Sequence, residues 1–276
     1  MFIILLLSIL LSVQAPASPI VIGHRGASFY APEGTKPSYE LAITQQADYL
    51  EADIQRSKDG ILFVFHDKNL KRTTDVVKKF PSRRNKNIKF FTLKELKGLD
   101  AGSWFNKEYP ERSRKDYAGI KLLTLDEFLN IAKGKNIYLE TKNPKWHPGI
   151  EKDLYLTLKK RKWLKKQNII LQTFDQRSLL LLNKYMPDIS KCFLLHPSET
   201  DLFGQSAWAN RHGAEYIGIP IELYSKHISK KVHSLGLGIH VFTVNDVIEL
   251  KVVQGEDGIF TNVPDIAGLI KKFPIQ

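Results

Sequence analysis

The chain has 276 residues, of which 43% are hydrophobic and 25% are charged, and its formal net charge is +12 at pH 7. This composition is typical of a folded globular protein and excludes a wholly disordered chain, and the length suits one large domain. The single cysteine, Cys192, excludes an intrachain disulfide, and its place in the apolar stretch 191–195 predicts a core thiol rather than a nucleophile.

The N-terminus carries an apolar run, residues 2–13, interrupted only by two serines and followed by Gln14-Ala15-Pro16-Ala17. A short apolar run before an A-x-A end is typical of a secretory signal peptide, and a bilayer span would need about 20 apolar residues. No Lys or Arg precedes the run, so a buried first strand or a wrongly chosen start codon is the alternative. We expect a signal peptide, residues 1–17, and a secreted or periplasmic mature protein, residues 18–276.

Apolar runs of strand length alternate with amphipathic stretches of helix length along the mature chain. The runs predicted as strands are residues 20–23, 49–54, 137–141, 169–173, 191–195, 216–219, 238–243 and 258–261. The predicted helices between them include residues 36–46, 125–133, 152–165, 176–185 and 225–235. Strands alternating with helices indicate a parallel sheet. Eight such units predict an α/β fold of the closed (β/α)8 kind, a TIM barrel.

A ninth strand-like run, residues 62–66, follows the second predicted strand too closely for a parallel crossover. Such a crossover needs a dozen or more residues, so a hairpin with Asp59-Gly60 in its turn is expected. This hairpin places His66 roughly opposite Glu51. Because side chains alternate along a strand, Glu51 and Asp53 share a face. We therefore expect these two acids to converge with His66.

The segment that follows, residues 67 to about 121, is much longer than the two to six residues of an ordinary βα loop. It contains a helix-like stretch, residues 92–99. We expect a small insertion here.

Three acids, Glu51, Asp53 and Glu140, fall at the ends of neighbouring predicted strands. Active sites of these barrels lie at the C-terminal ends of the strands. Carboxylates suit a hard divalent cation, Ca²⁺ or Mg²⁺, whereas zinc would favour more His or Cys. A single acid at a strand end is usually a surface ion pair, but three facing one barrel mouth would repel each other without a cation.

His24 and His66 are the candidate catalytic acid and base, because imidazole titrates near neutrality. A lone buried histidine is usually structural, but two beside a carboxylate cluster favour catalysis. Arg25 provides a fork for phosphate oxygens, and Lys142 provides a point charge. Arg25 pairing with Glu33 is the structural alternative for that arginine, and both roles are compatible. Gln172 ends the next predicted strand at the same mouth.

These residues occur in a series of short motifs. In chain order they are His24-Arg25-Gly26, Pro32-Glu33-Gly34-Thr35, Glu51-Ala52-Asp53, Phe65-His66-Asp67, Leu99-Asp100-Ala101-Gly102-Ser103-Trp104-Phe105, Leu139-Glu140-Thr141-Lys142, Phe242-Thr243-Val244-Asn245 and Asp257-Gly258-Ile259-Phe260-Thr261-Asn262. The series resembles the glycerophosphodiester phosphodiesterase family, whose usual pattern begins HRG, PENT, ExD and FHD. The resemblance covers nearly the whole mature chain.

The resemblance implies a TIM barrel with an inserted subdomain beside the mouth, the histidine pair as catalytic residues and the metal on the same three acids. It implies hydrolysis of glycerophosphodiesters, such as glycerophosphocholine or glycerophosphoethanolamine, to sn-glycerol 3-phosphate and an alcohol. The sequence departs from the family pattern at Gly34 (usually Asn), Thr141 (aliphatic), Phe242 (commonly Trp) and Asn262 (frequently Asp). Phe242 is placed with the substrate-binding residues by its motif.

Two other functions fit parts of the sequence. A phospholipase D-like activity on lysophospholipids or sphingomyelin would use the same barrel, with an apolar track supplied by Trp104, Phe105 and Tyr109. A non-catalytic barrel could bind phosphate-bearing polymers through its basic surface, but that function predicts a broken catalytic set.

Basic runs lie at residues 82–89 and 159–166. They are interpreted as solvated faces, with attraction to anionic surfaces as the alternative. A nucleic-acid module would interleave aromatic platforms with the charge, but the second run offers only Trp163 and the first has none. We therefore expect a small-molecule substrate and no nucleic acid.

Overall fold

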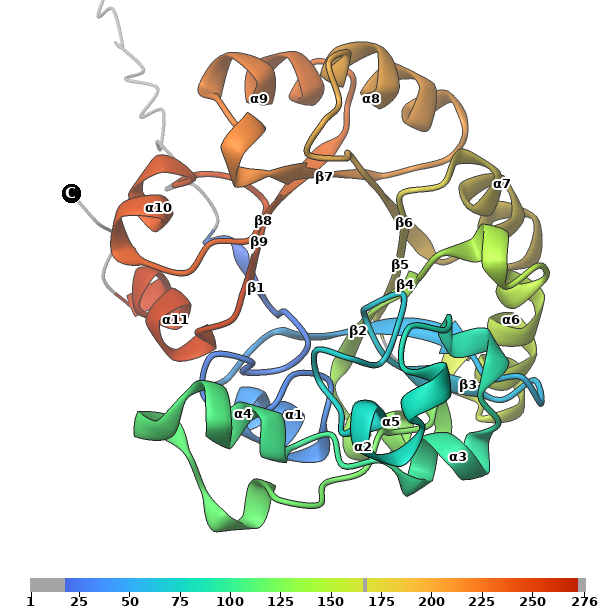
Figure 1. Ribbon diagram of the computed structural model, residues 1–276. Helices are drawn as coiled ribbons and strands as arrows, with labels where there is room; N and C mark the ends of the chain where they lie inside the picture. The colour runs from blue at the N-terminus through green and yellow to red at the C-terminus, as the bar shows by residue number, and fades with distance from the viewer. Residues whose placement is uncertain (1–17, 166–167, 273–276) are drawn as a thin grey trace, which may run out of the picture.

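A closed ring of parallel strands forms the centre of the protein (Figure 1). The computed structural model describes residues 18–165 and 168–272, so the expected signal peptide lies outside the described residues. The ring contains β1 (Ile20–Gly23), β2 (Tyr49–Arg56), β4 (Asn136–Thr141), β5 (Ile169–Thr173), β6 (Ser190–Leu194), β7 (Tyr216–Pro220), β8 (Gly238–Phe242) and β9 (Gly258–Thr261). Because β1 pairs with both β9 and β2, the sheet closes. The predicted TIM barrel is confirmed.

Helices surround this ring (Figure 1). Those of the barrel are α1 (Lys36–Thr44), α5 (Leu125–Ile131), α6 (Ile150–Lys160), α7 (Gln176–Tyr185), α8 (Leu202–Arg211), α9 (Lys226–His233), α10 (Val247–Val252) and α11 (Pro264–Lys272). The helix predicted over residues 152–165 ends earlier, because Lys162 has a left-handed φ of 59° and a separate 3₁₀ turn, Trp163–Lys165, follows. Within the described parts of the chain, no helix has the length and apolar character to cross a membrane.

The predicted hairpin is present, and its second strand, β3 (Leu62–Val64), pairs antiparallel with β2 outside the ring. Gly60 adopts the positive φ of 85° that its turn requires. The strand ends at Val64, which pairs with Ile54, two residues before its predicted end at His66. His66 therefore follows the strand in a loop, rather than pairing with a residue of β2.

Between β3 and α5 the chain forms a small layer of short helices: α2 (Val76–Lys79), α3 (Leu93–Gly98) and α4 (Ser103–Glu108). The stretch predicted as helical, residues 92–99, contains α3, and Thr92 caps it by accepting from the N–H of Glu95. Phe91 and Leu96 are fully buried in the core of this layer, which also contains Phe63 from β3. The layer is thus attached to the barrel through the hairpin.

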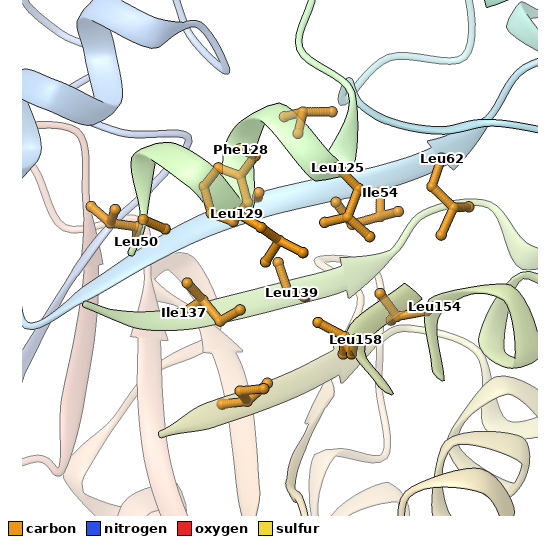
Figure 2. Packing of buried hydrophobic residues seen from close by; sticks show 14 of the residues in the cluster. Leu50, Ile54, Leu62, Leu125, Phe128, Leu129, Ile137, Leu139, Leu154 and Leu158 are labelled. Atoms are coloured by element: carbon orange, nitrogen blue, oxygen red, sulfur yellow. The ribbon is translucent and has the colours of Figure 1, made fainter. Parts of the chain in front are cut away.

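Alternation of side chains divides each strand between the two sides of the ring. On β2 and β4, Leu50, Ile54, Ile137 and Leu139 point outward and pack against α5 and α6, where Phe128 is fully buried (Figure 2). The intervening side chains point into the barrel, where a second apolar cluster includes Tyr138, Ile170 and Cys192. Cys192 is buried, as predicted, and burial raises the pKa of its thiol to about 12.

Strand register places polar inward side chains at one level. Asp53 on β2 pairs with Glu140 on β4, and Glu140 pairs with Gln172 on β5. Parallel strands run in the same direction, so these side chains all lie toward the C-terminal mouth of the barrel.

Candidate active site

The three predicted metal ligands converge at the barrel mouth. Glu51 and Asp53 lie two residues apart on β2, and Glu140 lies beside them on β4. One carboxylate oxygen from each lies within 4.8 Å of the others, and all three side chains are buried. Three buried carboxylates so close together require positive charge nearby, since unpaired buried charges are costly.

Protein groups hold each carboxylate in place. Glu51 accepts hydrogen bonds from the backbone N–H of Arg25, at 2.8 Å, and from the side-chain amide of Gln172, at 3.1 Å. The Lys142 ammonium lies 3.3 Å from Asp53 Oδ1 and 2.9 Å from Glu140 Oε1. The acids are thus oriented by neighbours from separate parts of the chain. Their three negative charges exceed the positive charges of Lys142 and of Arg25, whose Nε lies 3.3 Å from Asp53 Oδ2.

The titration behaviour of the acids reflects this excess. Burial raises the pKa of Glu51 well above its ordinary value and that of Glu140 to about 7, and the charge of Asp53 raises both further. Burial also acts on Asp53, but the charges of Lys142, His66 and Arg25 hold its pKa below the usual range.

A divalent cation would favour ionisation of all three acids. The donor set fits such a cation, and Gln172 Oε1, a buried oxygen in the same cavity, lacks a hydrogen-bond partner among the described residues.

The two predicted histidines line the same cavity. His24 Nδ1 lies 2.8 Å from Asn262 Oδ1, which also accepts from the Ser28 hydroxyl at 2.8 Å. Burial, and then the charge of Arg25, lowers the pKa of His24 to about 3, so its imidazole is neutral near pH 7. His66 Nδ1 lies 2.7 Å from Asp67 Oδ1. One histidine thus faces a neutral acceptor and the other a carboxylate.

Arg25 lies between two acids, with Nη1 2.9 Å from Glu33 Oε1 and Nε 3.3 Å from Asp53 Oδ2. The predicted pairing of Arg25 with Glu33 is therefore present. The loop that carries Arg25 adopts left-handed backbone, with φ of 58° at Arg25 and 88° at Gly26. A Cβ at Gly26 would lie 2.5 Å from the Ser38 carbonyl carbon, so only glycine lets this loop pack against α1.

A cavity of about 120 Å³ brings the predicted residues together. Of the predicted set it is lined by His24, Arg25, Glu51, Asp53, His66, Glu140, Lys142, Gln172 and Phe242. Glu33 does not line it, but pairs with Arg25, which does.

Sequence reasoning missed Arg72 and gave no role to Asp67, which together connect Glu33 to His66. The position of Asp67 beside His66 in the Phe65-His66-Asp67 motif was the available signal for that residue.

A TIM barrel whose mouth combines an acidic metal-type cluster, two histidines and two cations has the groups that a phosphoric diester hydrolase needs. The sequence comparison is more specific, because residues 24–266 match the model of the glycerophosphoryl diester phosphodiesterase family. The chain belongs to this family.

Three known proteins illustrate the relationship. The glycerophosphodiester phosphodiesterase of Bacillus subtilis (strain 168) is 36% identical over 266 residues, which cover 94% of this chain and 88% of that protein. The glycerophosphodiester phosphodiesterase of Bacillus altitudinis is 29% identical, over 91% of this chain and 98% of that protein. The solved structure of an Oleispira antarctica phosphodiesterase, in complex with the product sn-glycerol-3-phosphate, has a TM-score of 0.76 and 27% identity, and covers 92% of this chain and 97% of that chain.

Proposed function

We propose that the mature chain is an exported, metal-dependent enzyme that hydrolyses glycerophosphodiesters, such as glycerophosphocholine or glycerophosphoethanolamine, to sn-glycerol 3-phosphate and an alcohol. The buried cluster of Glu51, Asp53 and Glu140 carries this proposal, because it shares one cavity with two cations and two histidines. The product bound by the Oleispira antarctica relative supports a small-molecule substrate that contains glycerol phosphate.

The three acids would hold Ca²⁺ or Mg²⁺, cations that prefer oxygen ligands. When bound, such an ion supplies Lewis-acid polarisation of the phosphate oxygens and offsets the charge that develops on them. The side chains of Arg25 and Lys142 would bind the phosphate from the cavity wall, and Gln172 and Phe242 would complete the substrate pocket. Phe242 packs edge-on against Phe174, at 6.0 Å between ring centroids, which gives this side of the pocket an apolar surface.

The surroundings of the two histidines support different roles for them. Asn262 Oδ1 accepts from both Ser28 and His24 Nδ1, which leaves His24 Nε2 as the basic nitrogen. His24 would be the general base that takes the proton of the attacking hydroxyl or water. The Asp67 carboxylate accepts from His66 Nδ1 and orients the ring so that Nε2 is left for the substrate, and His66 would be the general acid that protonates the leaving oxygen.

Charged side chains interrupt the apolar track that an acylated lipid would need at the barrel mouth. Phe105 is fully buried, and the Arg112 guanidinium covers the rings of Tyr109 and Phe29 at 4.1 and 4.0 Å. Trp104 lines the neighbouring cavity of about 230 Å³ together with Arg72 and Arg112. The two guanidinium groups stand among the aromatic rings of this mixed lining, and their charge favours a deacylated substrate over a lysophospholipid or sphingomyelin.

The proposal is tested by measuring release of sn-glycerol 3-phosphate or free alcohol from a substrate panel at saturating Mg²⁺ or Ca²⁺. Glycerophosphocholine and glycerophosphoethanolamine are compared with lysophosphatidylcholine and sphingomyelin. We expect turnover of the deacylated compounds and at least tenfold lower kcat/KM for the acylated ones. Preferential turnover of an acylated substrate would replace the proposal with the lipid-directed activity.

A further inference from the structure

We infer that Arg72 is a positioning residue that orients two other side chains of the site at once. These are Arg25, which binds the phosphate, and His66, which protonates the leaving oxygen. This inference rests on the proposed function, because it requires Arg25 and His66 in those roles. Arg72 lies in the loop after β3, at the start of the inserted layer, and does not line the central cavity.

One side of Arg72 binds the acid that orients Arg25. Its Nη1 and Nη2 atoms lie 2.7 Å from Glu33 Oε2 and Oε1, respectively. Glu33 Oε1 is also the atom that accepts from Arg25, at 2.9 Å. Both oxygens of Glu33 are therefore used, and the carboxylate stands between two guanidinium groups.

The other side of Arg72 binds the acid that orients His66. Its Nε lies 2.7 Å from Asp67 Oδ2, and its Nη2 lies 2.9 Å from Asp67 Oδ1. Asp67 Oδ1 in turn faces His66 Nδ1 at 2.7 Å. A continuous series of charge-assisted hydrogen bonds thus runs from Arg25 through Glu33, Arg72 and Asp67 to His66.

This connection requires the planar fork of arginine. Three nitrogens of one guanidinium bind two carboxylates from different loops, whereas a lysine would offer a single point charge on a flexible stem. Without Arg72 the two acids would face each other without a cation between them, and their loops would separate. The charges of Arg25 and Arg72 outweigh burial and hold the pKa of Glu33 at about 2, so the acid is ionised over the working range.

The connection is accessible from solvent, which makes it testable by chemical rescue. The Arg72 side chain is 45% exposed, and it contacts the cavity of about 230 Å³ that Trp104 also lines. A small guanidinium compound can therefore reach the space that Arg72→Ala would open.

The experiment measures kcat and KM for glycerophosphocholine at saturating divalent cation in Arg72→Ala, Arg72→Lys and the wild type, with and without ethylguanidinium or ethylammonium. We expect Arg72→Ala to lose roughly 10²-fold in kcat/KM, the size of loss that a misplacement of about 1 Å produces. Ethylguanidinium should raise the kcat/KM of Arg72→Ala several-fold, and ethylammonium should leave it unchanged. Arg72→Lys should remain at least tenfold below the wild type.

Two single variants separate the halves of the connection. Glu33→Gln should mainly raise KM, because it releases the phosphate-binding Arg25, and Asp67→Asn should mainly lower kcat, because it releases the proton donor. The matched control is Arg114→Ala, which removes an exposed arginine of the same inserted layer whose guanidinium pairs with Asp116 at 3.1 Å. It should leave both constants unchanged and show no response to ethylguanidinium.

Wild-type kinetics in Arg72→Ala, or full activity in Arg72→Lys, would overturn the inference. Equal rescue of Arg72→Ala by ethylguanidinium and ethylammonium would overturn it as well. If Arg72→Ala does not fold, the Arg72→Lys kinetics and the KM-against-kcat split of the two single variants still decide it. A wild-type enzyme without activity on any glycerophosphodiester would instead overturn the proposed function.

Discussion

Acid should destabilise the barrel through His240, a buried histidine on β8. Its side chain is fully buried, its Nδ1 lies 2.8 Å from the Tyr138 hydroxyl, and its ring stacks on Tyr216 at 4.3 Å. Its Nε2 has no hydrogen-bond partner among the described residues. Protonation would therefore bury an unpaired charge, and burial lowers the pKa of His240 from 6.5 to about 3.

The sign and size of the effect follow from linkage. Because the folded-state pKa is depressed, the unfolded chain binds more protons between pH 6.5 and about pH 3. The contribution of His240 to the free energy of unfolding is fully present above the pKa of the unfolded chain. It is lost as the pH falls toward the pKa of the folded protein. At about pH 5 the expected loss from this residue is about 2 kcal/mol, from a 1.36 kcal/mol cost per pKa unit.

The assay is denaturant unfolding of the wild type and His240→Gln at about pH 7.5 and about pH 5. Glutamine retains an acceptor for Tyr138 but does not titrate. The effect of the substitution itself on stability cancels, because each protein is compared between the two pH values. The loss of unfolding free energy between the two pH values should be about 2 kcal/mol smaller in His240→Gln. An equal loss in both proteins would refute the assignment of acid sensitivity to His240.

Three further predictions concern catalysis, the core and processing. His24→Ala and His66→Ala should each lower kcat by roughly 10² to 10⁴ with little change in melting temperature; near wild-type kcat in either variant would return that histidine to a structural role. Phe128→Ala should reduce the unfolding free energy by roughly 3–5 kcal/mol, because it empties a fully buried site between the strands and Tyr39, whose ring lies at 4.7 Å; its kcat should be unchanged, and a loss under 1 kcal/mol would show that the site collapses. Intact mass of the protein from its native host should show cleavage after Ala17, and a soluble cytoplasmic species that retains residues 2–17 would contradict export.

The ring and its acidic cluster could be predicted because both depend on local patterns. Alternation within one strand places Glu51 and Asp53 on a single face, and parallel neighbours at equal register bring Glu140 to the same level. Such relations need only strand order and direction, which the alternation of apolar runs and helices supplies.

The connection through Arg72 could not be predicted in the same way. Arg72 and Glu33 are separated by 39 positions and lie in loops without a repeating pattern. His24 and its partner Asn262 are separated by 238 positions. Contacts between loops depend on the backbone path of each loop, and neither periodicity nor spacing specifies that path.

Three of the four departures from the family pattern have a local structural context. Gly34 adopts a left-handed φ of 66°, a conformation that glycine and asparagine tolerate best. Thr141 points away from the cavity and its hydroxyl bonds to Ser178 on α7, at 2.8 Å. Asn262 gives His24 a neutral acceptor instead of a carboxylate. These substitutions leave the acids and both histidines in place.

The central claim is that the Glu51, Asp53 and Glu140 cluster makes this barrel a metal-dependent glycerophosphodiesterase. Its most direct test is release of sn-glycerol 3-phosphate from glycerophosphocholine by the purified mature chain, before and after EDTA treatment and dialysis, with Mg²⁺ or Ca²⁺ then restored. We expect EDTA to abolish turnover, one of these ions to restore it, and Glu140→Gln to recover little. Full turnover in the metal-stripped protein would contradict metal dependence.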